Sequence, residues 1–286
     1  MWVYNTAVNL ITELMVDEAN EKWTTSRTIP LGVRPICGAF TPDNSHVYVS
    51  IGGNPDNLGA IAVLNVASGE VVKRWETGRE GCGTVLSRDK SRMYVNVGFH
   101  ARNPEAMNDV WYAFNPSTHE VLRTGQLKGV MDNHGLGETP DGKEVWILNR
   151  QSNTMTVLDT ATWTQQQVIG VGERPDILDF SPDGKYAFWT QRGEPQTGDP
   201  HALRGTQPGV QVFDVANKRA VAYSPVAGDP HGVAVRTIMA PAMMLPSAPS
   251  APSALPRTGD PASLLLAALG GLITALAGYG IRRLAR

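Results

Sequence analysis

The sequence has little cysteine and no excess of charge of either sign. Two cysteines, Cys37 and Cys82, in 286 residues cannot form the disulfide framework of a small secreted scaffold. The 25 basic and 27 acidic residues nearly balance. A balanced composition lacks the basic footprint of a nucleic-acid-binding domain, so we expect no nucleic-acid partner.

Several signals that identify enzymes and exported proteins are also missing. The sequence contains no nucleophile elbow, phosphate-binding loop, haem-attachment motif or zinc-protease helix. No two histidines stand at a close metal-binding spacing. Met1-Trp2-Val3-Tyr4 leads directly into strand-like sequence, with no secretory signal peptide. We therefore predict no cofactor, and the alternative is a metal ion at His134 and His231.

Turn-forming residues are abundant, and they belong to a repeat. The chain has 29 glycines and 20 prolines. A unit of about 42 to 55 residues recurs, which is the period expected for propeller blades. In each copy a tight turn contains an aspartate, and an aromatic residue that begins a strand stands five positions later. The pairs are Asp43 with Tyr48, Asp89 with Tyr94, Asp141 with Trp146, and Asp183 with Phe188.

A second marker closes each unit, a strand that ends in Asn or Asp before a turn of small residues. Its copies are Val63-Leu64-Asn65, Ala113-Phe114-Asn115, Val157-Leu158-Asp159 and Val212-Phe213-Asp214. We interpret Val3-Tyr4-Asn5 as a fifth copy, so the chain opens inside a unit. The pattern then predicts four nearly complete copies, a leading half copy and a trailing first strand at 231–238. Each copy contains about four short strands, which predicts an all-β chain.

The third copy, residues 145–160, resembles the YVTN-type β-propeller family. Trp146-Ile147-Leu148-Asn149 stands in place of the strand that names the family, and residues 152–160 match the strand that follows. The resemblance covers residues 1–237 and implies four-stranded blades around a channel. Such propellers typically have seven blades, whereas about five are present. We therefore expect an N-terminally incomplete ring, and the alternative is a five-bladed ring that the trailing strand closes.

The C-terminal segment, 255–286, predicts attachment to a cell envelope. An apolar run at 262–281 contains no charge and is about 20 residues long, enough to cross a bilayer as a helix. The basic tail at 282–286 favours the cytoplasmic side. Before the run stand Leu255, Pro256, Arg257, Thr258 and Gly259.

This order resembles the LPXTG cell-wall sorting signal of Gram-positive-type surface proteins. The resemblance implies that a sortase cleaves after Thr258 and joins it to peptidoglycan. A plain membrane anchor is the alternative. Either interpretation places the folded part outside the membrane. The linker at 238–254 consists almost wholly of Pro, Ala, Ser and Met, a composition that suits an extended stalk.

Aligning the repeats on the turn aspartate brings polar residues into two columns at the start of each first strand. Seven positions before the aspartate stand Ile36, Cys82, His134, Asp176 and, by extrapolation, His231. Nine positions before it stand Arg34, Glu80, Asp132, Arg174 and Asp229. In a propeller the first strand is the innermost, so both columns should lie at one mouth of the channel.

Two long loops, at 98–109 and 191–209, should share this face, and long polar loops on a rigid scaffold commonly carry recognition. We predict a ligand site here. Its members are Arg34, Glu80, Cys82, His134, Arg174, Asp176 and His231, with His100 and His201 on the loops.

Several of these residues also have a purely structural interpretation. Asp132-Asn133-His134-Gly135 and Asp229-Pro230-His231-Gly232 resemble a blade-entry turn of the same family, which implies that the histidines hydrogen-bond a neighbouring blade; a metal or catalytic role is the alternative. Cys82 aligns with Ile36, so Cys37 has the opposite strand parity and should point to the other face of its sheet. We therefore expect the two cysteines to remain unbonded.

The sequence leaves three functions open. The first is a surface-anchored binding module for a protein, a polysaccharide or a small molecule. The second is a propeller enzyme, a lactonase-like hydrolase or a metal- or cofactor-dependent oxidoreductase, with its site at the channel mouth. The third is a structural component of the surface layer.

Overall fold

A computed structural model describes residues 1–52, 59–99, 109–194 and 204–236. The chain divides into two compact units, Met1–Thr237 and Ile238–Arg286. All described residues belong to the first unit. They form five antiparallel sheets, one of three strands and four of four strands, which we call blades 1 to 5 in chain order.

Each blade is a meander in which every strand pairs with the next one along the chain. Blade 1 contains β1 (Trp2–Asn5), β2 (Leu10–Asp17) and β3 (Lys22–Pro30), with a 3-10 turn η1 (Thr6–Val8) after β1. Blade 2 contains β4 (Pro35–Phe40), β5 (His46–Ile51), β6 (Ala60–Asn65) and β7 (Val71–Glu76). Blade 3 contains β8 (Glu80–Leu86), β9 (Met93–Phe99), β10 (Val110–Phe114) and β11 (Val121–Gln126).

The last two blades have the same order. Blade 4 contains β12 (Asn133–Glu138), β13 (Glu144–Asn149), β14 (Thr154–Asp159) and β15 (Gln165–Gly170). Blade 5 contains β16 (Pro175–Phe180), β17 (Tyr186–Gln191), β18 (Gly209–Asp214) and β19 (Arg219–Pro225).

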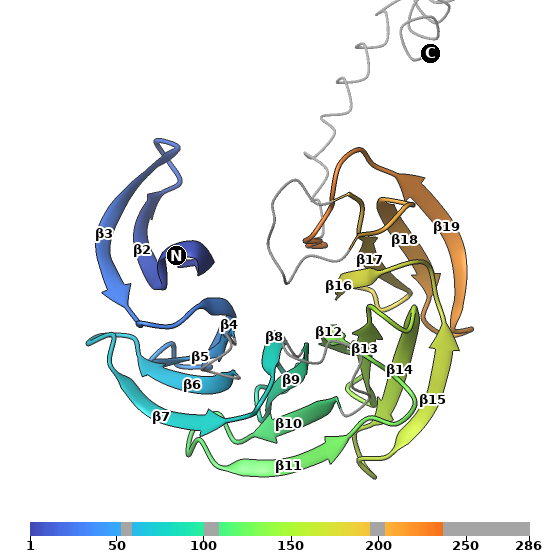
Figure 1. Ribbon diagram of the computed structural model, residues 1–286, viewed down its shortest axis with the longest axis horizontal. Helices are drawn as coiled ribbons and strands as arrows, with labels where there is room; N and C mark the ends of the chain where they lie inside the picture. The colour runs from blue at the N-terminus through green and yellow to red at the C-terminus, as the bar shows by residue number, and fades with distance from the viewer. Residues whose placement is uncertain (53–58, 100–108, 195–203, 237–286) are drawn as a thin grey trace, which may run out of the picture. The chain divides into compact units, whose positions relative to one another are not determined.

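The blades are arranged radially. The first strands of neighbouring blades contact one another, β4 with β8, β8 with β12 and β12 with β16. The fourth strands β7, β11, β15 and β19 lie on the outer side of the arc (Figure 1). Burial follows this order, since every residue of β12 is buried and every residue of β19 is exposed. The predicted all-β fold with propeller blades is therefore confirmed.

The core lies between successive blades, because each sheet covers the face of the next. Trp146 of blade 4 is fully buried and packs edge-on against Phe180 and Phe213 of blade 5, with ring centroids 5.2 and 5.8 Å apart. Tyr48 is equally buried and contacts Phe114 of blade 3. In blades 2 to 4 the aromatic residue of the repeat thus fills the space between blades, where burial of such a large side chain contributes about 1.5–3 kcal/mol, whereas Phe188 of blade 5 is only partly buried.

Blade 1 corrects the interpretation of the N-terminal repeat. In blades 2 to 5 the Asn or Asp at the end of the third strand accepts a backbone N–H from the following turn. In blade 1 the residue that makes this contact is Asp17, at the end of β2, so β2 corresponds to a third strand. The closing marker of blade 1 is therefore Asp17, and the assignment of Val3-Tyr4-Asn5 to that marker was wrong. β1 occupies the place of a second strand, and blade 1 has three strands rather than half a blade.

The predicted trailing strand also differs from the structure. None of residues 231–236 lies in a strand, and 237–238 lie outside the described residues. Among the described residues β1 pairs only with β2, so no C-terminal strand completes blade 1 there. The segment is nevertheless held against blade 5, because the Val235 backbone N–H donates to Asp179 Oδ2 at 2.7 Å.

The described residues contain no helix long and apolar enough to cross a membrane. The predicted linker, the sorting motif and the apolar run at 262–281 all lie outside that part of the chain.

Candidate functional site

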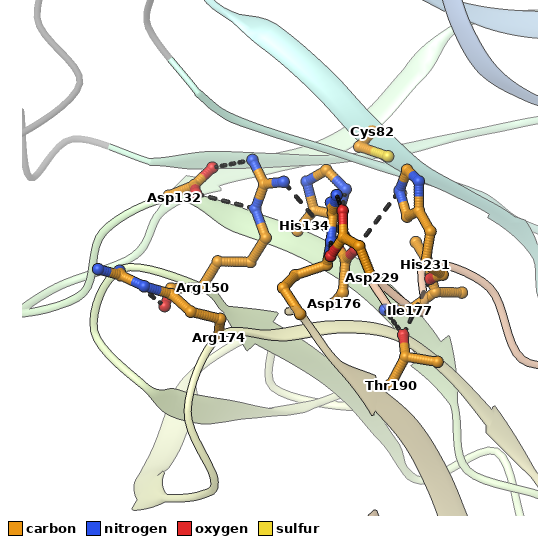
Figure 2. A network of polar contacts seen from close by, with 12 residues as sticks. Cys82, Asp132, His134, Arg150, Arg174, Asp176, Ile177, Thr190, Asp229 and His231 are labelled. Atoms are coloured by element: carbon orange, nitrogen blue, oxygen red, sulfur yellow. Dashed lines mark hydrogen bonds and ion pairs between the residues drawn. The ribbon is translucent and has the colours of Figure 1, made fainter. Parts of the chain in front are cut away.

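The two aligned columns meet where the first strands of blades 4 and 5 begin. Asp176, the second residue of β16, is fully buried and lies between two imidazoles (Figure 2). Its Oδ1 lies 2.9 Å from His134 Nε2, and its Oδ2 lies 3.4 Å from His231 Nε2. His134 is as buried as Asp176, whereas the His231 side chain is 53% exposed. His134 and Asp176 therefore form the buried part of the cluster, and His231 is the member that solvent reaches.

Two buried arginines flank the same carboxylate. Arg192 Nη1 donates to Asp176 Oδ2 at 3.0 Å, and Arg150 Nη1 lies 3.8 Å from Oδ1. Each guanidinium also has its own carboxylate. Arg150 donates through two nitrogens to Asp132, both at 2.9 Å, and Arg192 donates through two nitrogens to Asp229, one at 2.7 Å. Paired, fork-shaped contacts of this kind satisfy a buried guanidinium far better than a single contact does.

The local backbone explains why the two blades approach so closely here. A Cβ atom on Gly135 would lie 2.1 Å from the Asp176 carbonyl oxygen, so only glycine lets β12 reach β16 at this point. Asp132 and Arg174, both nine positions before a turn aspartate, have left-handed φ values of 61° and 48°. Such conformations cost non-glycine residues about 1–3 kcal/mol and concentrate at functional sites.

Neighbouring opposite charges in this cluster shift the pKa values of Asp176 and Arg150 in favour of their charged forms. Burial opposes the charged form of Asp176, but His134, Arg150 and His231 outweigh it and hold the pKa of Asp176 well below its usual range. Burial likewise opposes the charge on Arg150, yet Asp132 and Asp176 raise the pKa of that guanidinium. Asp176 therefore stays a carboxylate although no solvent reaches it.

In blades 2 and 3 the arginine–carboxylate pairs come from other positions of the repeat. Arg34 Nη2 donates to Glu80 Oε2 at 2.6 Å across the blade boundary. In blade 3 the pair is Arg79 with Asp109, at 3.2 Å. Burial raises the pKa of Asp109 to about 7, against the opposing effects of the Asn133 backbone N–H and Arg79. Among the described residues each four-stranded blade thus contributes an arginine to at least one arginine–carboxylate pair in this region, from different positions of the repeat.

The two cysteines correct the parity argument. Cys37 Sγ and Cys82 Sγ lie 2.8 Å apart, so both side chains point into the same space between β4 and β8. The two side chains do lie on opposite faces of equivalent sheets, but the conclusion that this keeps them apart was wrong. Cys37 lies on the face of blade 2 that covers blade 3, as Gly83 lies on the face of blade 3 that covers blade 4, and Cys82 lies on the face of blade 3 that blade 2 covers. Both cysteines are free thiols in this structure, and their spacing leaves the bonding state to be tested.

The predicted site residues are thus partly brought together. His134, Asp176 and His231 meet at one point, and Arg34 meets Glu80 elsewhere on the mouth. Arg174 lies beside the cluster and donates to the Arg150 carbonyl at 3.4 Å. In the view of Figure 2, Cys82 lies above the His134 and His231 rings. His100 and His201 lie outside the described residues.

Sequence reasoning missed Arg150 and Arg192. Each directly follows a second strand, and the equivalent residues of blades 2 and 3 are Gly52 and Gly98. The backbone N–H at this position donates to the carbonyl of the column residue Arg34, Asp132 or Arg174 in three blades. A third aligned column, glycine in two blades and arginine in two, was the signal that could have identified them.

Comparisons with known proteins inform the fold only. No family model matches the sequence, and no curated protein matches it. Among solved structures, hydrazine synthase of Kuenenia stuttgartiensis is similar with a TM-score of 0.60 and 18% identity, over 79% of this chain and 62% of that one. The propeller of Dos1 gives a TM-score of 0.58 and 13% identity, over 80% of this chain and 57% of that one.

A functionally unknown protein from Desulfotomaculum acetoxidans is similar with a TM-score of 0.56 and 13% identity, over 78% of this chain and 65% of that one. The chain therefore spans less than two thirds of the length of each of these three structures. Identities this low carry no information about activity. Together with the blade topology, the similarities establish that the described residues form the blades of a β-propeller.

Proposed function

We propose that this chain is a binding module displayed on a bacterial envelope, and that its ligand docks at the channel mouth around His231. The observation that carries the proposal is the convergence of His134, Asp176 and His231 from successive positions of the repeat onto one partly exposed point. Propellers expose short edges and present loops and strand ends at the channel, so this is the usual place for a site.

The chemistry of the mouth suits a polar ligand. Arg34 and Arg174 are partly exposed there, while Asp176, Asp132 and Arg150 are buried beneath and fix the surrounding charges. Because this network is already rigid, its exposed hydrogen-bond donors do not lose conformational entropy when a ligand binds. The ligand classes that fit are a polysaccharide, a polar segment of a protein or a polar small molecule.

Ligand capture tests the docking site. The full-length protein, purified in detergent, is screened on glycan arrays and against envelope extracts alongside Arg174→Ala and His231→Ala. We expect both substitutions to abolish a captured signal that Arg123→Ala, on the exposed outer strand β11, leaves unchanged. Equal capture by all four proteins would overturn the docking site.

The proposal of envelope display rests on the sorting motif, the apolar run and the basic tail. A sortase would cleave after Thr258 and transfer the chain to peptidoglycan. We expect the wild-type protein to resist hot detergent and to be released only when the wall is digested. Thr258→Ala should become extractable by detergent, and Ser253→Ala, outside the motif, should behave as wild type. Detergent extraction of the wild type would leave a plain membrane anchor.

An enzyme is the second candidate, because a buried His–Asp contact beside an exposed histidine is also an arrangement that moves protons. A lactonase-like hydrolase or a metal- or cofactor-dependent oxidoreductase would use the same mouth. Turnover of a lactone panel or of redox dyes by the full-length protein, lost in His231→Ala and kept in Arg123→Ala, would favour this candidate over simple binding.

A further inference from the structure

We propose that His134, Asp176 and His231 bind one divalent first-row transition-metal ion at the channel mouth. The inference deepens the proposed function and rests on the same site, but it specifies the chemistry that the site holds. Three successive members of one repeat column supply the three side chains, so the ring geometry of the fold creates the cluster.

The distances suit a shared ion. All three side chains offer a ligand atom within 4.8 Å of the others, and the two histidine nitrogens lie 2.9 and 3.4 Å from the carboxylate oxygens. An ion bound at about 2.0–2.2 Å from nitrogen and oxygen ligands holds those ligands about 3–3.5 Å apart. Small rotations of the partly exposed His231 ring are enough to complete the set.

The charge balance favours a cation despite the neighbouring arginines. Arg150 is neutralised by Asp132, and Arg192 by Asp229, each through two contacts. Asp176 is the carboxylate left over, and with neutral imidazoles its charge is the net charge of these five groups. Arg174 also lies beside the cluster, but it is partly exposed and screened by solvent, so a divalent ion would still meet the negative charge of Asp176.

The surrounding contacts resemble the outer support that metal ligands require. Arg192 donates to Asp176 Oδ2, which leaves Oδ1 toward His134 for the ion. The backbone carbonyls of the two histidines are held from equivalent positions of the preceding blade. Asn96 Nδ2 donates to the His134 carbonyl at 2.6 Å, and Thr190 Oγ1 donates to the His231 carbonyl at 2.9 Å. These two contacts hold the backbone of the histidines, and Arg192 is the outer partner of the Asp176 carboxylate itself.

The ligand set specifies the class of ion. Two imidazoles and one carboxylate suit zinc and ferrous iron and are a poor match for calcium or magnesium. Three protein ligands leave coordination positions open. His231 is 53% exposed, so those positions would face solvent and could accept water or a ligand.

Metal titration of the full-length protein tests the inference. The chain is purified in detergent, stripped with a chelator and titrated with Zn²⁺ by calorimetry and with Co²⁺ by visible absorption. We expect about one ion per chain and a cobalt spectrum typical of mixed nitrogen and oxygen ligands. His134→Ala and His231→Ala should each weaken binding by more than about 100-fold, because loss of even an outer-shell partner costs 10–100-fold.

His46→Ala is the matched control, because His46 stacks edge-on against His119 with ring centroids 4.6 Å apart yet belongs to no such cluster. It should bind as wild type. If the buried His134 variant fails to fold, the exposed His231 variant still decides the question.

Absence of binding by the wild type, or wild-type affinity in His231→Ala, would overturn the metal site. Sorting at Thr258 and ligand capture through Arg174 have separate readouts, so failure of the metal site is distinguishable from failure of the proposed function.

Discussion

The two sides of the channel mouth use one repeat to build different chemistry. In blades 2 and 3 the position nine residues after the turn aspartate is glycine, and a Cβ on Gly52 would lie 2.9 Å from both Arg34 and Glu80. In blades 4 and 5 the same position is Arg150 or Arg192, and both guanidinium groups lie beside Asp176. A single column of the repeat thus decides whether the arginine of a blade comes from this position or from elsewhere.

The largest effect should come from uncoupling the buried charges of blade 4. Asp132→Asn keeps the shape and tolerates the left-handed φ of 61°, but it leaves the fully buried Arg150 without its two-nitrogen partner. We expect the free energy of unfolding to fall by about 3–5 kcal/mol. The exposed pair of Arg74 with Glu76 is the control, and Glu76→Gln should cost less than about 1 kcal/mol. Denaturant unfolding measures both, and equal losses would contradict the contrast.

The stability of blades 2 and 3 should respond to oxidation, because the two cysteines lie at their contact. With Cys37 Sγ and Cys82 Sγ 2.8 Å apart, treatment with diamide should join them and reduce the diamide. Closing the loop between these residues is expected to raise the free energy of unfolding by about 2–4 kcal/mol.

Loss of two hydrogen atoms in the intact mass and a higher unfolding midpoint are the readouts of this cross-link. Cys82→Ser should abolish both changes. Oxidation that instead yields dimers of the chain would show that the two thiols do not face each other.

The close approach of blades 4 and 5 provides the next test. Gly135→Ala places a methyl group against the Asp176 carbonyl and should cost about 1–3 kcal/mol by forcing the strands apart. The same change should weaken metal binding, because it separates His134 from Asp176. Gly170→Ala is the control, since a Cβ there meets no atom within 4 Å. An unchanged metal affinity in Gly135→Ala would show that the contact does not depend on this spacing.

The smallest expected effect concerns the acid dependence of unfolding, and it should be similar in blades 3 and 5. The turn aspartates of these blades lie at the ends of the first strands that are remote from the candidate site. The Ser87 hydroxyl and the Ser91 N–H lower the pKa of Asp89 to about 2, and the Ser181 hydroxyl and the Lys185 N–H also lower the pKa of Asp183. A lowered pKa stabilises the fold above the unfolded value near 4, and this stabilisation is lost as pH falls through the folded value. Asp89→Asn should flatten the acid dependence of unfolding between pH 4 and 2, and Asp183→Asn should flatten it below pH 4. A large difference between them would break the symmetry.

The repeat made much of the fold predictable and only part of the site. Turn aspartates, strand-leading aromatics and the column that holds His134, Asp176 and His231 were all visible as sequence periodicity. Arg150 and Arg192 were missed because the alignment searched only the columns before the turn. The contact between the cysteines was missed because strand parity describes one sheet, whereas stacking brings the opposite faces of successive blades together.

The sequence by itself determined the number and order of strands in most blades, because turn residues and apolar alternation act locally. Only the tertiary structure decided which column members meet. Contacts such as that of His134 with Asp176 depend on how closely adjacent blades approach, and Gly135 sets that distance. Radial packing thus converts a periodic pattern into a site that no single repeat contains.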